Sequence, residues 1–423
     1  MATRTKRAAT QIPDLPPELW DHIFDFATYV PYTLVPEIFE KSTFIGPCYN
    51  QQYHPKLRAA LVTKRYLVRV CRRWWHIAIR HLYRAIYIGR ARCLSSLCAT
   101  LQKYAIGKGT VAGAEPLGRW TQRLDVVIRD HLTRADTEAD YYLADIIKCL
   151  PNIAIVSFAM TFIPGNVLPT PLFGIVDALR YSASSIRILD WTTPAKPAVS
   201  ELVELLKSLP RLHTFHCPYL SWGNEKFPTS ILSSVNTLAL TFGPPLAEID
   251  AENTSISLRK IILDTRWDVG LWEEFMDIYG TFLTSIHFDC NNFTRNLTDY
   301  LDMVNRQCPN LLQMTICVEE FSSISFVDSP LPSVGYLGLM SQKFQETRSG
   351  YRKLFSSLAI LNAVVPTLRV VQLLDCHNVQ CLLTRHSRVV TRALEHELAG
   401  SNFRIVDHEG NLLSDSLPVM QKA

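Results

Sequence analysis

Two stretches of sequence indicate the fold: LRKIILD at Leu258–Asp264 and LTSIHFD at Leu283–Asp289. Each has apolar residues at its first, fourth and sixth positions. The alternation at the end of each stretch is the period of a short β-strand, in which successive side chains point to opposite faces. The two stretches begin 25 residues apart. This spacing predicts a repeat that contributes one strand per unit.

The same LxxLxL pattern recurs along most of the chain when other apolar residues are allowed at the leucine positions. Its nine occurrences are Ile153-Val156-Phe158, Ile186-Leu189-Trp191, Leu212-Phe215-Cys217, Val235-Leu238-Leu240, Leu258-Ile261-Leu263, Leu283-Ile286-Phe288, Leu311-Met314-Ile316, Val334-Leu337-Leu339 and Leu368-Val371-Leu373. Successive occurrences begin 23 to 34 residues apart. Tyr83-Ile86-Ile88 and Leu124-Val126-Ile128 extend the series toward the N-terminus. We expect parallel strands at all of these positions.

The segments between the expected strands have helical periodicity. In SELVELLKSLP, residues 200–210, the leucines recur at the spacing of one helix face, and LWEEFMDIYGTFL (271–283) and LTDYLDMVNRQC (297–308) repeat that spacing. Strands and helices that alternate in a fixed period predict a curved stack of parallel strands with helices on its outer side. The expected fold class is therefore α/β, with the strands on the concave side of a solenoid.

This part of the chain resembles the leucine-rich repeat family, whose period is ~20–29 residues. Leu368-Val371-Leu373 is followed by Cys376 and Val379, which matches the cysteine-containing form of the repeat. Most other units lack the Asn or Cys at that place, Asn291 being the exception. The resemblance implies an irregular array over residues 90–410, followed by a C-terminal tail at 411–423.

Upstream of the repeats, two short segments each carry two adjacent apolar stripes. PPELWDHIFDFAT (16–28) has one stripe of Leu19, Ile23 and Phe26 and another of Trp20, Phe24 and Ala27, and RVCRRWWHIA (69–78) divides in the same way around Trp74 and Trp75. Burying an aromatic side chain contributes ~1.5–3 kcal/mol, so both stripes need a cover. Two small helices cannot cover each other's doubled faces, and a second surface is implied.

These segments resemble the F-box family, whose pattern is LPxEL followed by a short helix and an LxxVCRRWxxIA-like helix. The matching residues are Leu15, Pro16, Glu18, Leu19, Ile23, Leu67, Val70, Cys71, Arg72, Arg73, Trp74, Ile77 and Ala78. Together with the following LYRAIYI, the split pattern is similar to the F-box-like proteins of mushroom-forming fungi. The resemblance implies an F-box-like helical domain at 13–89, with an insertion at 29–56 and a flexible basic tail at 1–12.

The F-box resemblance also implies a function: substrate recognition in a Skp/cullin/F-box ubiquitin ligase. The N-terminal helices would bind a Skp-type adaptor, and through it a cullin, while the repeats would bind an unknown protein target. The residues assigned to the adaptor are Leu15, Pro16, Leu19, Ile23, Val70 and Trp74. One apolar stripe around Trp74 or Trp75 is expected to pack inward, and the other to form or support the adaptor interface.

Target binding is assigned to the concave face, where polar positions of a strand surface are expected to meet solvent. The middle repeats carry the most directional side chains there, and the candidates are Asp190, His216, Lys260, Asp264, His287 and Asp289. Asp264 and Asp289 belong to neighbouring strands and could also form a carboxylate pair with His287 nearby. No GxSxG, GxxxxGK, HExxH or GxGxxG motif is present, so the chain is expected not to be an enzyme.

The amino-acid composition narrows the remaining classes of function and location. The chain has 48% hydrophobic and 19% charged residues and a net charge of +4, which is typical of a globular protein without a strong overall field. Its eleven cysteines form no CxxC pair, so neither a metal site nor a cofactor is expected. The N-terminal residues lack the apolar stretch of a secretory signal, and no run of ~18 apolar residues occurs. A cytoplasmic or nuclear location without membrane contact is expected.

Two alternatives stay open at this point. Residues 64–92 contain nine basic residues and no acidic one, a composition that could serve nucleic-acid binding, although the arginines alternate with residues too apolar for a free surface. Alternatively, the N-terminal helices only cap the apolar end of the first repeat and bind no adaptor.

Overall fold

A computed structural model describes most of the chain. The described residues are 15–31, 33–34, 47–105, 115–128, 137–159, 174–193, 197–218, 226–240, 256–265, 268–290, 297–326, 331–343 and 345–416, without the side chains of 47–54 and 137–140. The predicted tail at 1–12 and most of the predicted C-terminal tail therefore lie outside the described residues. The proposed domain boundaries stay a prediction.

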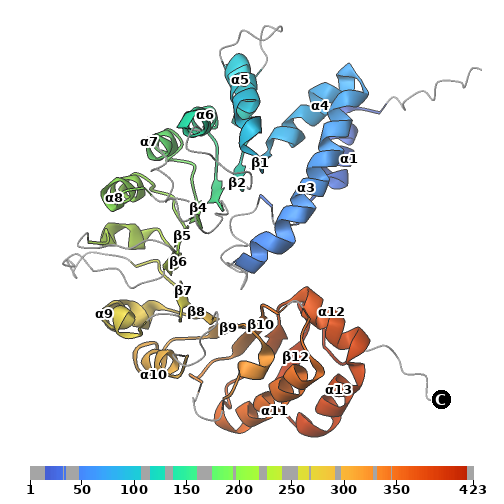
Figure 1. Cartoon of the computed structure of the whole chain (residues 1–423), viewed down its shortest axis with the longest axis vertical. Coiled ribbons are helices and arrows are strands. Elements are labelled where there is room, and N and C mark those ends of the chain that lie inside the picture. The colour runs from blue at the N-terminus through green and yellow to red at the C-terminus, as the bar shows by residue number, and fades with distance from the viewer. Residues whose placement is uncertain are drawn as a thin grey trace, which may run out of the picture.

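Among the described residues, twelve parallel strands form one sheet in strict sequence order (Figure 1). They are β1 (Ala85–Ile88), β2 (Arg123–Val126), β3 (Ile155–Phe158), β4 (Ile188–Trp191), β5 (Thr214–Cys217), β6 (Thr237–Leu240), β7 (Lys260–Asp264), β8 (Ser285–Cys290), β9 (Gln313–Val318), β10 (Tyr336–Ser341), β11 (Val370–Leu373) and β12 (Arg404–Val406). The first eleven occupy the expected positions. The α/β solenoid predicted from the repeat is confirmed.

The last strand, β12, was not predicted from the LxxLxL pattern. Its Ile405 is the register partner of Val371 on β11, so Asn402 and Asp407 occupy the first and third apolar places of the repeat. Asp407 instead accepts hydrogen bonds from the backbone amides of Glu409 and Asn411 and closes a turn. The final unit thus ends the array with a polar turn in place of an apolar position.

Helices cover the outer side of the sheet, and the main core lies between them and the strands (Figure 1). The α-helices are α5 (Leu94–Ala105), α6 (Thr137–Lys148), α7 (Ile175–Arg180), α8 (Val199–Lys207), α9 (Gly270–Tyr279), α10 (Leu297–Gln307), α11 (Arg348–Val364), α12 (Cys376–Arg385) and α13 (Ser387–Arg392). Shorter turns are η1 (Ala91–Cys93), η2 (Leu117–Trp120), η3 (Thr229–Ser233), η4 (Gly280–Phe282), η6 (Phe321–Ser323) and η7 (Ala393–Glu397). The three helical segments expected from periodicity correspond to α8, α9 and α10.

In the described part of the chain, three helices precede the sheet: α1 (Pro17–Ala27), α3 (Pro47–Val70) and α4 (Arg72–Tyr83). The sequence placed an insertion at 29–56, and α3, which is 24 residues long, begins inside it. Leu57, Ala60 and Leu61 of α3 are buried in a small cluster with Ala85 of β1. The helix is therefore held by apolar contacts with the first strand that no local pattern reveals.

Helix α3 lies across the open side of the curved arc (Figure 1). Lys56 of this helix is close enough to Cys376, the first residue of α12, for its positive charge to influence the pKa of that thiol. Burial raises the pKa of Cys376, and the positive charge of Lys56 opposes this rise. The N-terminal helices thus approach both ends of the array.

Candidate functional site

Helix α1 separates its two apolar stripes between the interior and the surface. Trp20 and Phe24 are buried, and their ring centroids lie 4.8 Å and 4.9 Å from the ring centroid of Trp74 on α4. At these distances the rings pack edge to face or tilted, which contributes beyond the area they bury. The aromatic cluster fixes α1 against α4.

The other stripe of α1 is open to solvent. Leu19 is 49% exposed, Ile23 43% and Phe26 87%. Among the remaining residues assigned to the adaptor, Val70 and Pro16 are exposed, whereas Leu15 and Trp74 are half-buried. Trp74 is turned toward Trp20 and Phe24, so it is positioned to support this face from behind. Phe26 was absent from the assigned residues, although its position seven residues after Leu19 places it on the same stripe.

Ion pairs hold α1 and α4 together beside the aromatic cluster. Oδ1 of Asp21 lies 2.8 Å from Nε of Arg80 and 2.6 Å from Nε2 of His81, and Nη1 of Arg84 donates to Oδ1 of Asp25 at 2.8 Å. Burial raises the pKa of Asp21, but its hydrogen bonds with Arg80 and His81 outweigh burial and leave that pKa below its usual value. Burial lowers the pKa of His81. The network fixes the direction in which the exposed stripe faces.

The nine basic residues between Lys64 and Arg92 do not form one surface. Lys64 is 7% exposed, and burial lowers its pKa to about 8. Arg80 and Arg84 pair with the carboxylates of α1. The exposed members are Arg65, Arg69, Arg72, Arg73, Arg90 and Arg92. Arg73 also donates a hydrogen bond to the backbone carbonyl of Leu15. Four of the nine basic residues therefore make contacts within the protein.

On the concave face, one row of register partners brings two assigned residues together. Ser157, Asp190 and His216 are neighbours on β3, β4 and β5. The Ser157 hydroxyl donates to Oδ2 of Asp190 at 2.8 Å, and Nδ1 of His216 lies 3.0 Å from Oδ1 of the same carboxylate. His287 occupies the same row on β8, three strands beyond His216. Asp190 and His216 therefore interact, and His287 is separate from them.

The other assigned residues lie at the two ends of neighbouring strands. Asp264 and Asp289 are register partners on β7 and β8, as expected from their positions in the repeat. Lys260 begins β7 and so lies at the opposite end of that strand from Asp264. Burial lowers the pKa of Lys260 to about 8. The six candidates thus occupy three different rows and do not form one cluster.

The expectation that the concave positions meet solvent is wrong for four of them. His216, Lys260, Asp264 and His287 are only 3% to 7% exposed, while Asp190 and Asp289 are half-buried. Strands ~4.8 Å apart let side chains in one row cover each other. A second apolar cluster also occupies this face, formed by Ile155, Ile188, Ala239 and Ile262. The concave face is therefore partly a core, and its assignment to target binding stays a prediction.

Comparisons with known proteins add little to these observations. No protein-family model matches the chain, and no curated protein is similar to it in sequence. Among solved structures, the leucine-rich repeat-containing protein LegL7 from Legionella pneumophila matches with 11% identity and a TM-score of 0.34, over 80% of this chain and 92% of that one. No helix among the described residues is both long and apolar enough to cross a membrane.

Proposed function

We propose that this protein is the substrate-recognition subunit of a Skp/cullin/F-box ubiquitin ligase. Helices α1 and α4, together with the end of α3, bind a Skp-type adaptor, and the solenoid binds a protein target. The chain itself supplies no catalytic group in this proposal. The F-box-like residues at both ends of the N-terminal region and the parallel repeat solenoid support it.

The exposed stripe of α1 is the observation that carries the proposal. Surface helices normally turn their large apolar residues inward, yet Leu19, Ile23 and Phe26 point outward while Trp20 and Phe24 fill the interior. A contiguous apolar stripe on one helix, with Val70 also exposed at the end of α3, is the composition of a protein interface. The stripe includes two of the residues that the F-box resemblance assigns to the adaptor.

The experiment is a calorimetric titration of the chain with a recombinant Skp-type adaptor. Leu19→Asp places a charge in the proposed interface and is expected to weaken binding by about 2 kcal/mol or more, roughly thirtyfold. Leu271→Asp is the matched control, because Leu271 is also in the first turn of a helix and is 47% exposed. Binding by the control variant should equal that of the wild type.

Two results would contradict the proposal. One is a wild-type chain that does not bind the adaptor, which is what the capping interpretation predicts. The other is a folded Leu19→Asp variant with unchanged affinity. Phe26→Asp provides a second variant should Leu19→Asp lower the melting temperature, because Phe26 is 87% exposed and contributes little to the fold.

A further inference from the structure

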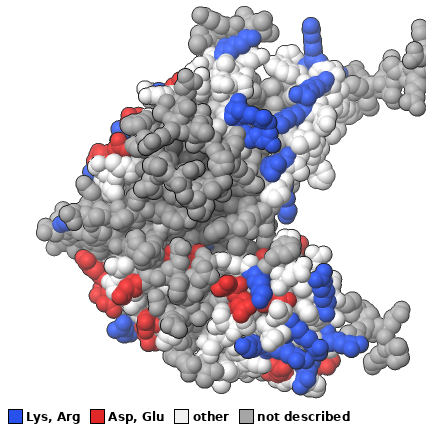
Figure 2. All heavy atoms as spheres, in the orientation of Figure 1, with Lys and Arg blue, Asp and Glu red and all other residues white. Residues whose placement is uncertain are grey.

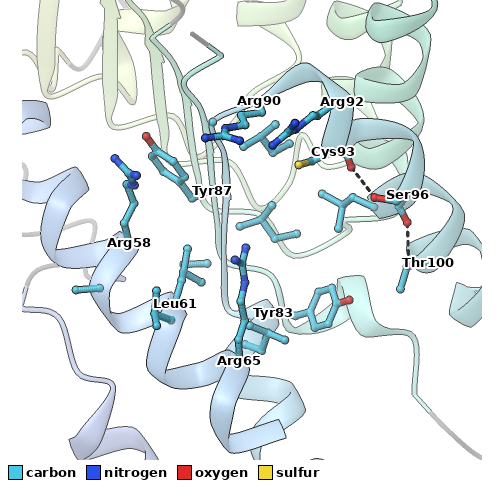
Figure 3. Close-up of a pocket in the computed structure, with 18 of the residues that line it drawn as sticks. Arg58, Leu61, Arg65, Tyr83, Tyr87, Arg90, Arg92, Cys93, Ser96 and Thr100 are labelled. Atoms are coloured by element: carbon cyan, nitrogen blue, oxygen red, sulfur yellow. Dashed lines mark hydrogen bonds between the residues drawn. The ribbon is translucent and has the colours of Figure 1, made fainter. Parts of the chain in front are cut away.

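A groove at the N-terminal end of the solenoid has no role in the proposed adaptor interface. It lies between α3, strand β1 and the segment that leads into α5, and its volume is about 1390 Å³ (Figure 3). Sites for small molecules measure ~300–1,000 Å³. The groove is therefore larger than a small ligand needs, and it suits a segment of polypeptide.

Four arginines line the two sides of the groove. Arg58 and Arg65 extend from α3, and Arg90 and Arg92 extend from the opposite side, before α5 (Figure 3). All four are exposed, and within the described part of the chain none of their guanidinium groups has a hydrogen-bond or ion-pair partner. The described lining contains no Asp or Glu. Lys and Arg also dominate the surface over α3 in the space-filling view (Figure 2).

The lining between the arginines is apolar. Leu61 and Val62 contribute from α3, Leu97 from α5, and the residues of β1 lie along the groove. Val62 is 50% exposed, so part of this apolar surface is open to solvent. Arg58 and Arg65 are seven residues apart on their helix, which corresponds to about 10 Å. The groove thus offers an apolar strip flanked by positive charge at intervals along both sides.

We infer that this groove binds an extended polypeptide segment in which acidic and apolar side chains alternate. Alternate side chains of an extended chain point in opposite directions, so one set can contact the apolar strip while the other meets the arginines. Carboxylates form charge-assisted hydrogen bonds with guanidinium groups. The charge of the groove therefore selects acidic segments and repels basic ones.

The lining favours a polypeptide over a nucleic acid. Bases stack on aromatic rings that are free to receive them, but Tyr83 packs against the main core and Tyr87 against the cluster of α3 and β1. Apart from Cys93, Ser96 and Thr100, the side chains between the arginines are mostly aliphatic, which suits leucine-like side chains. The inference rests on the proposed function in one respect only, which is that the bound segment belongs to the target. The groove itself is separate from the exposed stripe of α1.

The test measures fluorescence anisotropy of a labelled dodecapeptide in which aspartate alternates with leucine, titrated with the full chain. Arg58→Glu/Arg65→Glu is expected to weaken binding at least tenfold, since two charge-assisted contacts become repulsive. Arg352→Glu/Arg388→Glu changes the net charge equally at exposed residues outside the groove and should leave affinity unchanged. Val62→Asp should also weaken binding, whereas Val364→Asp, on α11, should not.

Three further probes distinguish the alternatives. A dodecapeptide with lysine in place of aspartate should not bind, and one with serine in place of leucine should bind more weakly. Equal affinity for the serine peptide, no binding of the aspartate–leucine peptide, or unchanged affinity in the Arg58/Arg65 variant would overturn the inference. Tighter binding of a single-stranded RNA dodecamer, lost in the same variant, would assign the groove to nucleic acid. Because no adaptor is present, these results do not depend on adaptor binding.

Discussion

Trp74 and Phe26 show how one pair of helices divides its aromatic residues between fold and surface. Trp74 belongs to the motif that resembles the F-box, and its ring packs on Trp20 and Phe24. Phe26 is 87% exposed although burying it would contribute ~1.5–3 kcal/mol. The sequence predicted two apolar stripes on this helix. Because the two stripes are similarly apolar, it did not predict which one faces the solvent. The packing of Trp74 on one stripe, together with the ion pairs of Asp21 and Asp25 with α4, decides which stripe faces outward.

Lys64 carries a prediction about stability and pH. Its pKa falls from 10.5 to about 8 on folding because the ammonium group is buried. A lowered pKa means that the unfolded chain binds the proton more tightly between pH 8 and 10.5, so stability rises with pH across that window. At pH 7 the Lys64 ammonium group is charged in both the folded and the unfolded chain, so the full free-energy cost of burying this charge lowers stability. Lys64→Met is therefore expected to raise the free energy of unfolding at pH 7 by ~1–3 kcal/mol.

Urea unfolding at pH 7 and at pH 10 measures this effect. The advantage of Lys64→Met should shrink at the higher pH, where the wild-type amine loses its proton within the fold. Lys103→Met is the control, because Lys103 is exposed on α5 and should show no such difference between the two pH values. A Lys64→Met variant less stable than the wild type at pH 7 would show that the ammonium group stabilises the fold.

Among the elements, the strands were the most predictable. Each of the first eleven strands buries its own apolar residues against the outer helices, so the signal is local and repeats in every unit. The strand β12 lacked the signal because Asn402 and Asp407 occupy apolar places. The length of α3 was not predictable, since its apolar residues pack on β1 and on the start of the insertion. Arg65, Arg90 and Arg92 belong to the basic segment seen in the sequence, but the groove they line was missed because separate chain segments form it.

Asp190, in the row on β3, β4 and β5, can be tested for a role in stabilising the fold as distinct from a role in target binding. Asp190 binds the Ser157 hydroxyl and lies beside His216, so Asp190→Ala leaves two neighbours without this carboxylate. We expect a loss of ~1–3 kcal/mol in the free energy of unfolding, measured by thermal or urea denaturation. Asp177→Ala is the control, because Asp177 pairs with Arg180 at the exposed surface of α7. Unchanged stability with lost target capture would instead place the target on the concave face.

At the scale of the whole molecule, the parallel array follows from the sequence repeat, but the arrangement of its open side does not. Helix α3 spans that side from the first strand toward α12, and the concave face carries a partly apolar core of its own (Figure 1). The N-terminal end offers accessible apolar surface in two places, on the stripe of α1 and in the groove beside β1. Both proposed interfaces of the protein lie there.

The most direct measurement is hydrogen–deuterium exchange of the full chain with and without a Skp-type adaptor. The account predicts slower exchange in α1 and at the junction of α3 and α4, residues 67–74, with unchanged exchange in β4 to β9. The Leu19→Asp variant should lose this protection while the solenoid exchanges as in the wild type. Unchanged exchange in α1 at saturating adaptor, or protection confined to the solenoid, would contradict the account.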